Sequence, residues 1–134
     1  MAGLDIGYAQ ALLGAWQGTL EVSQLLTICE ELEEKDLAPL SVVLYQTWLN
    51  RNQTPLNHVA WFNLGASLFR VNDLAGAEQA YQRAIELAPS FLQPRFNLGM
   101  TYERLGRVEE AIEAWRWIDD HVPPDQIESR PMLL

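Results

Sequence analysis

The chain has little positive charge, few reactive side chains and no long apolar run. Its 134 residues include 18 Asp and Glu against 9 Lys and Arg, which gives a net charge of −9. Nucleic acids and anionic membranes are bound largely through Lys and Arg that displace counterions, so we expect neither as a partner. No apolar stretch approaches the roughly 18 residues that would span a bilayer, and no charged-then-apolar leader opens the chain. We therefore expect a cytoplasmic protein.

The residues that build catalytic and metal sites are also sparse. Cys29 is the sole cysteine and falls at an apolar position of an expected helix, which predicts a buried structural thiol. His58 and His121 are far apart and lie in no HExxH motif, and the glycines form neither a GxGxxG pattern nor a phosphate loop. Three further acidic residues fit the exposed first turn of a helix, where carboxylates meet the dipole favourably: Glu109, Glu110 and Glu113. We expect no catalytic residue, cofactor or metal in this chain, and no enzymatic activity of its own.

What the sequence does contain is a packed, repetitive pattern. Hydrophobic residues make up 49% and charged residues 20%, which excludes intrinsic disorder and indicates one domain with a real core. Displacing the chain by 34 residues aligns 58–91 with 92–125. Eight positions are then identical: Phe62/Phe96, Asn63/Asn97, Leu64/Leu98, Gly65/Gly99, Arg70/Arg104, Ala77/Ala111, Ala80/Ala114 and Pro89/Pro123.

These two copies resemble the tetratricopeptide repeat, a 34-residue helical hairpin with a W-x2-L-G-x2-Y, A-x3-F, Pro signature. The second copy departs from it at Arg95, where the first aromatic residue is expected, and at Ile118, where a small residue is expected. We therefore expect looser outer packing there. The matching residues are Trp61, Leu64, Gly65, Leu68, Ala77, Tyr81, Ala84 and Pro89 in the first copy, and Leu98, Gly99, Tyr102, Ala111, Trp115 and Pro123 in the second.

Local signals agree with a helical hairpin. Gly65 leaves room for a second helix to approach closely, Asn72-Asp73 is suited to capping that helix, and Pro89 ends it. Ser90 followed by Gln93 predicts a capping box that opens the next helix. The apolar face of the first helix is expected to comprise Leu64, Leu68 and Val71, and that of the second Ala77, Tyr81, Ala84 and Ile85.

The flanking regions are also helical in pattern. Residues 1–57 predict three helices, which we interpret as degenerate repeats or an N-terminal cap, since 57 residues alone make a marginal core. Residues 126–134 predict the start of a capping helix; the apolar ending fits a short cap, a fragment of a longer protein, or self-association through terminal helices. The apolar positions of the three N-terminal helices are Tyr8, Leu12, Leu13 and Trp16; Val22, Leu25, Ile28, Cys29 and Leu32; and Leu40, Val43, Leu44, Thr47 and Trp48.

Residues 40–125 bear a second, narrower resemblance. The order of LYQTWL at 44–49, WFNLG at 61–65, DLAGA at 73–77, PSF at 89–91 and NLG at 97–99 is similar to the repeat region of bacterial SPINDLY-type glycosyltransferases, relatives of the protein O-linked N-acetylglucosamine transferases. In that family an asparagine ladder on the inner face holds the protein substrate. Asn63 and Asn97 match this ladder. No sugar-nucleotide domain is present, so the resemblance implies docking and not catalysis.

The family resemblance also implies where a partner binds. Stacked repeats form a right-handed superhelix whose first helices line a concave groove. A carboxamide both donates and accepts hydrogen bonds, so Asn63 and Asn97 suit contact with the main chain of an extended peptide, although they equally fit water-facing positions. Arg70 and Arg104 would add positive charge. The partner-binding residues expected are Phe62, Asn63, Ala66, Phe69 and Arg70 in the first repeat and Gln93, Phe96, Asn97, Met100 and Arg104 in the second.

The sequence thus predicts an all-α stack of about seven helices plus a C-terminal stub, acting as a protein-interaction module. The favoured hypothesis is a partner-docking domain of a larger bacterial glycosyltransferase. A free-standing adaptor and a self-assembling scaffold are the alternatives.

Overall fold

The computed structural model describes residues 2–123, with side chains from Gly7 onward, and every regular element in that range is a helix. This confirms the predicted all-α solenoid; the expected capping stub at 126–134 lies outside the described residues. None of these helices is long and apolar enough to cross a bilayer. In chain order they are α1 (Ala2–Gln17), α2 (Val22–Glu34), α3 (Ala38–Arg51), α4 (Asn57–Arg70), α5 (Leu74–Leu87), α6 (Gln93–Arg104) and α7 (Val108–His121).

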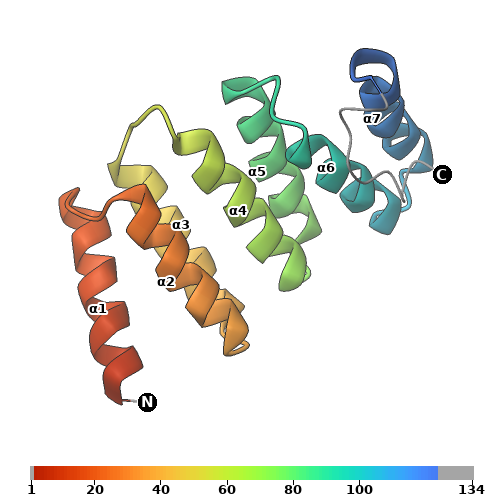
Figure 1. The fold of residues 1–134 in the computed structure, drawn as a ribbon. Coiled ribbons are helices and arrows are strands. Elements are labelled where there is room, and N and C mark those ends of the chain that lie inside the picture. The colour runs from red at the N-terminus through yellow and green to blue at the C-terminus, as the bar shows by residue number, and fades with distance from the viewer. Residues whose placement is uncertain (1, 124–134) are drawn as a thin grey trace.

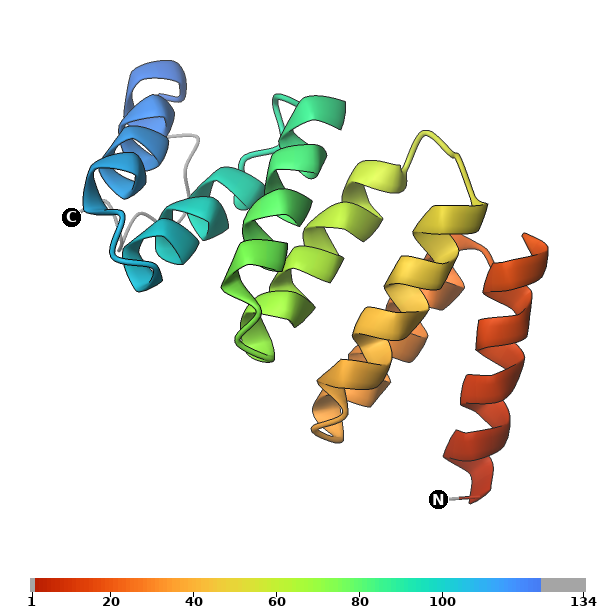
Figure 2. The same ribbon diagram turned by 180° about the vertical axis from the view of Figure 1, so that it is seen from behind.

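The helices form three consecutive antiparallel hairpins, α2/α3, α4/α5 and α6/α7, with α1 packed against α3 (Figure 1). In that view α2 and α4 lie in front of α3 and α5, and the reverse view brings α3 and α5 forward (Figure 2). Tyr8 donates to the carbonyl of Leu40 near the start of α3, and Asn52 donates to the carbonyl of Ala15 just beyond its end. Helices α1 and α3 therefore run parallel.

All three hairpins turn through one residue of positive φ, namely Asp36 (62°), Asn72 (67°) and Gly106 (81°). Only glycine, and less readily Asn or Asp, adopts this left-handed conformation at low cost. In each turn the next residue donates its backbone N–H to a carbonyl five residues earlier at 2.8 Å. The turns are 36 and then 34 residues apart, because α4 has 14 residues and α6 has 12. Helices α2 and α3 thus form the same kind of hairpin, at a spacing that a 34-residue comparison misses.

Two glycines allow the helices of a hairpin to pack closely. A Cβ atom at Gly65 would lie 2.6 Å from the ring of Tyr81, and one at Gly99 would lie 2.7 Å from Cδ1 of Trp115, so a side chain at either position would clash. In α2 Cys29 takes the equivalent place, 36 residues before Gly65. The core continues along the stack through Leu25, Cys29, Leu44, Tyr45, Trp48, Ala60, Leu64, Leu68, Ala77, Tyr81, Leu98, Tyr102 and Ala111, all buried.

Helix α6 does not begin at the predicted capping box. Its N-cap is Leu92, and no side chain caps it, so the expectation for Ser90 is wrong. Pro94 explains the difference. It occupies the first turn of α6, where its missing N–H costs nothing; a helix begun at Ser90 would place the proline ring against the Ser90 carbonyl. The predicted cap at Asp73 is confirmed, since its carboxylate accepts from the backbone N–H of Gly76 at 3.0 Å.

Several residues expected in apolar faces are exposed. Leu13 and Trp16 are 55% and 56% exposed, because the opposite side of α1 packs against α3, and Arg51 lies over the Trp16 ring at 4.1 Å. Val71 is exposed because α4 has already ended. Ile118, expected to loosen the second repeat, is instead fully buried.

Candidate functional site

All ten predicted partner-binding residues lie on the first helices of the second and third hairpins, five on α4 and five on α6. We call the side of α4 and α6 that carries them the inner face. The described residues also form clefts of about 580, 390, 350 and 330 Å³, and none of the ten residues lines any of these. None of these four clefts therefore lies on the inner face.

The two asparagines make different contacts. Asn63 donates its Nδ2 to the carbonyl of Val59 in its own helix at 2.8 Å. Asn97 donates its Nδ2 to Oη of Tyr81 at 3.2 Å and so joins α6 to the preceding hairpin. Both side chains are half-buried, and both make a hydrogen bond within the protein. Each retains a carboxamide oxygen, with no donor assigned to it, that could accept from a peptide N–H.

Tyr81 shows how closely Asn97 is coupled to the core. The tyrosine is 1% exposed, and its burial raises the pKa of the phenol to about 12, while the hydrogen bond with Asn97 acts in the opposite direction. A buried hydroxyl without a partner is costly, so Asn97 satisfies a polar group that the fold has already buried. Asn97 therefore has a structural role in addition to any contact with a ligand.

The predicted aromatic anchors are largely part of the packing. Phe62 lies 5.9 Å from Tyr81 and 5.3 Å from Phe91 between ring centroids, and both Phe62 and Phe69 pack against the buried core. The carbonyl of Phe96 accepts from Nε1 of Trp115 at 3.2 Å. Phe96 and Met100 are half-buried, whereas Gln93 is exposed and Ala66 is half-buried. Phe96 and Met100 thus keep part of their surface accessible, and we call this part of the inner face the apolar strip.

The two predicted arginines are already engaged within the protein. Nη2 of Arg70 lies 3.7 Å from Oε1 of Glu33 in α2. The guanidinium of Arg104 lies 4.8 Å from the centroid of the Phe69 ring, a cation–π arrangement. The Glu33 carboxylate also accepts a hydrogen bond from the buried hydroxyl of Ser67. Sequence reasoning missed the pairing of Glu33 with Ser67, because the two residues belong to different hairpins and to no short motif.

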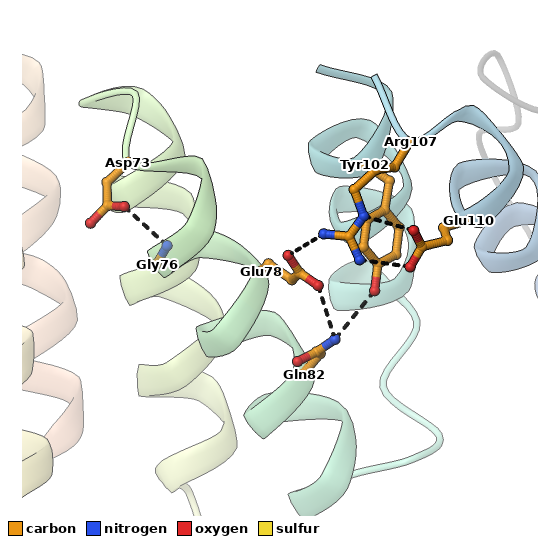
Figure 3. A network of polar contacts seen from close by, with 7 residues as sticks. All are labelled: Asp73, Gly76, Glu78, Gln82, Tyr102, Arg107 and Glu110. Carbon is orange, nitrogen blue, oxygen red and sulfur yellow. Dashed lines mark hydrogen bonds and ion pairs between the residues drawn. The ribbon is translucent and has the colours of Figure 1, made fainter. Parts of the chain in front are cut away.

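A second polar cluster lies between the α4/α5 and α6/α7 hairpins (Figure 3). Arg107 donates to Oε1 of Glu78 at 2.8 Å and to both carboxylate oxygens of Glu110 at 2.6 and 2.7 Å. Its guanidinium also lies 4.6 Å from the Tyr102 ring, and Gln82 donates to the Tyr102 hydroxyl at 3.2 Å. These contacts hold the pKa of Glu110 below its ordinary value. The cluster fixes one hairpin against the next and thereby fixes the spacing of the asparagines.

Arg95 replaces an aromatic residue and still packs on one. Its guanidinium lies 3.6 Å from the centroid of the Trp117 ring, and Nη2 donates to the carbonyl of Pro89 at 3.3 Å. The Nε atom is buried without a hydrogen-bond partner, and burial lowers the pKa of this arginine. The long side chain thus fills the place that Trp61 occupies one repeat earlier.

The residues of catalytic type are placed as structural groups. Cys29 is fully buried, and burial raises the pKa of its thiol to about 12, so almost no thiolate forms near neutral pH. The His121 ring stacks on Trp117 with its Nδ1 2.8 Å from that residue's carbonyl, and His58 meets the edge of Phe91. Among the side chains of residues 7–123, no three His, Cys, Asp or Glu come together as metal ligands would.

Comparison with known proteins agrees with this geometry. Models of the tetratricopeptide repeat match residues 58–91 and 80–113. Two solved structures of MamA superimpose on this chain with TM-scores of 0.67 and 0.64, at 24% and 22% sequence identity. The first superposition covers 75% of this chain and 58% of the MamA chain, and the second covers 84% of this chain and 67% of the MamA chain. Tetratricopeptide repeats are thereby confirmed, and repeats of this kind are typically non-catalytic modules that bind protein or peptide partners.

Curated relatives match a shorter stretch. The peroxisomal targeting signal receptor of Candida glabrata is 42% identical over 59 residues, and that of Kluyveromyces lactis is 40% identical over 60. These matches span 44% and 45% of this chain. They span only 10% and 11% of the two receptors, so the chain corresponds to a small part of each.

Proposed function

We propose that the chain is a docking module whose inner face, extended onto α2, holds a segment of a partner protein in an extended conformation. The observation that supports this most directly is the parallel placement of Asn63 and Asn97 on successive first helices, each half-buried with a carboxamide oxygen still available. We further propose that residues 22–57 are a third repeat, followed by the repeats at 58–91 and 92–125.

Binding would rest on main-chain recognition. An extended peptide exposes an N–H and a C=O at every residue, so two carboxamides at a fixed separation select for backbone geometry whatever the peptide's side chains. The apolar strip of Phe96 and Met100 would bury part of the ligand beside them. The cluster around Arg107 would keep the two asparagines at a constant separation, which lowers the conformational cost of binding.

The test uses peptides selected on the protein itself. A random dodecapeptide library displayed on phage is selected on the full chain, and the enriched sequences are synthesised and titrated. The variant Asn63→Ala/Asn97→Ala should weaken binding by about 1–3 kcal/mol, since each hydrogen bond contributes roughly 0.5–1.5. Asn50→Ala, an exposed amide on α3, is the control and should change affinity by less than twofold.

Two further measurements separate binding from folding. Asn97→Ala should by itself lower stability by about 1 kcal/mol, because it leaves the buried Tyr81 hydroxyl without its donor. Asn63→Ala should leave stability nearly unchanged, because Asn63 bonds only to its own helix. An unaltered affinity in a folded double variant would show that the inner face is not the docking site.

In its finer form, the proposal is that the partner is a protein substrate and the module belongs to a larger SPINDLY-type glycosyltransferase. The motifs between residues 40 and 125 support this. Reading the genomic sequence past the codon for Leu134 tests it, because an open frame that continues into a sugar-transfer domain would establish the enzyme context, and a stop codon would remove it.

Two alternatives remain in the same framework. A free-standing adaptor has only weak support from the similarity to a small part of the peroxisomal targeting signal receptors. A self-assembling scaffold would use the terminal helices, and sedimentation at several concentrations decides it: a chain that stays monomeric at high concentration is not a scaffold.

A further inference from the structure

The first helices of successive hairpins contact one another through an arginine, and the contact occurs twice. Arg70 of α4 approaches Glu33 of α2, and Arg104 of α6 approaches Phe69 of α4. Glu33 precedes Phe69 by 36 residues, and Arg70 precedes Arg104 by 34, which are the spacings of the hairpin turns. The two contacts are therefore equivalent, and Glu33, Phe69 and their counterpart in α6 occupy the same place in three hairpins.

The counterpart in α6 is Glu103, 34 residues after Phe69. Its side chain is exposed and has no hydrogen-bond or ion-pair partner within residues 7–123. In both preceding hairpins the residue at this place contacts a guanidinium group: the carboxylate of Glu33 in one, and the aromatic ring of Phe69 in the other. Glu103 is thus a carboxylate at a place where the protein twice binds arginine, and no arginine of the described residues contacts it.

The remaining charges on this face are also acidic. Glu30 and Glu34 lie in the last turns of α2, are exposed, and have no hydrogen-bond or ion-pair partner in the described chain. The last turn of α2 contains no basic residue, so these carboxylates lie at the negative end of the helix dipole, with Lys35 at the C-cap as the nearest basic residue in sequence. Arg70 and Arg104, which the sequence suggested as a source of positive charge, are already engaged. A ligand on this face therefore meets net negative charge.

We propose that the inner face binds an extended peptide that carries arginine side chains, one of which pairs with Glu103. This rests on the proposed function, that a peptide binds this face at all. A guanidinium fits the place better than an ammonium because its planar fork donates two parallel hydrogen bonds to a carboxylate and stacks on aromatic rings. Within the protein itself, Arg70 makes an ion pair with Glu33 and Arg104 lies over the Phe69 ring, so both a carboxylate and an aromatic ring already face a guanidinium at this place.

The first experiment compares two selections from the random dodecapeptide library, one on the full chain and one on Asn63→Ala/Asn97→Ala. Peptides enriched only on the unaltered chain should be rich in arginine. Enriched peptides without arginine would overturn this inference and leave the docking face in place. Equal enrichment on both proteins would overturn the proposed function itself.

The second experiment locates the arginine. An enriched peptide is titrated by fluorescence anisotropy against Glu103→Gln and against Glu109→Gln, an exposed carboxylate on α7 that removes the same charge away from the inner face. Glu103→Gln should weaken the peptide about five- to tenfold, whereas Glu109→Gln should change affinity by less than twofold in physiological salt.

A peptide in which the arginine is replaced by glutamine completes a double-mutant cycle. If the arginine pairs with Glu103, this peptide should bind the unaltered chain and Glu103→Gln with equal affinity, because the interaction is already lost. Equal effects of Glu103→Gln and Glu109→Gln, or additive losses in the cycle, would show that the peptide senses only the overall charge of the protein and would overturn the pairing.

Discussion

Replacing single glycines by alanine tests the close packing that holds each hairpin together. Three positions offer a matched set, because Gly7, Gly65 and Gly99 all lie inside helices and alanine should favour the helix at each by up to about 1 kcal/mol. A Cβ at Gly7 meets nothing within 4 Å. Gly7→Ala should therefore stabilise the protein by about 0.5–1 kcal/mol.

At Gly65 the same gain is opposed by a clash. The new Cβ would lie 2.6 and 2.7 Å from two carbons of Tyr81, roughly 1 Å short of normal contact, and that ring is fixed by Phe62 and by Asn97. Overpacking of this kind costs about 1–3 kcal/mol. Gly65→Ala should thus be destabilising by up to about 2 kcal/mol.

Gly99→Ala should destabilise the protein more than Gly65→Ala does, because its clash with Trp115 also displaces the indole N–H that donates to the carbonyl of Phe96. Urea unfolding followed by circular dichroism measures the series, with equal m-values as the check on two-state behaviour. Tyr81→Leu removes the ring that a Cβ at residue 65 would meet. In that background the further change Gly65→Ala should be neutral or stabilising. The reasoning fails if Gly65→Ala stabilises the protein as much as Gly7→Ala does.

Two further predictions concern titration and ion pairing. Burial raises the pKa of Tyr81 from 10.0 to about 12, so the unfolded chain loses this proton first. The associated stability is present below pH 10.0 and is lost as pH rises toward 12, by at most about 3 kcal/mol. Urea unfolding at several alkaline pH values should show a shallower decline for Tyr81→Phe, and an identical decline would contradict the assignment. Arg107→Met leaves Glu78, whose side chain is 17% exposed, without its ion pair and should lower the free energy of unfolding by more than the loss of an exposed pair does. Arg83→Gln removes only an exposed ion pair and should change the free energy of unfolding by no more than about 0.5 kcal/mol. Equal losses of stability in Arg83→Gln and Arg107→Met would mean that the cluster between the hairpins adds no stability.

The sequence was sufficient for those parts of the fold that depend on local chemistry. Gly65 opposite Tyr81, Asp73 as a cap and Pro89 beyond a helix end each act within one hairpin, so their spacing alone predicts the structure. The predicted start of the helix that became α6 was wrong for an equally local reason. The Ser90 pattern resembles a capping box, but the steric requirement of Pro94 is stronger than the hydrogen bonds that such a box would provide.

The side-chain contacts of the predicted site depend on residues distant in sequence. Asn97 lies on the predicted helix, but its bond to Tyr81 requires two hairpins to be packed together. Arg70 and Arg104 also lie where expected and are exposed, yet their guanidinium groups contact Glu33 and Phe69 of the preceding hairpins. Such pairings depend on the angle between neighbouring hairpins, which a single sequence does not encode in any short motif.

The unequal spacing of the hairpins decides which residues of α2 continue the inner face. A 34-residue displacement of Val59, Asn63, Ala66, Phe69 and Arg70 would select Leu25, Cys29, Leu32, Lys35 and Asp36, three of which are fully buried.

The 36-residue spacing of the turns selects Ser23, Thr27, Glu30, Glu33 and Glu34 instead, none of which is buried. Three of these five are acidic, and the contact between Glu33 and Arg70 agrees with this register and excludes the other. Because α4 is two residues longer than α6, the residues of α2 that continue the inner face are acidic and not apolar. The proposed preference for an arginine-bearing peptide rests on that difference, because an apolar surface would favour a hydrophobic segment and an acidic one attracts arginine.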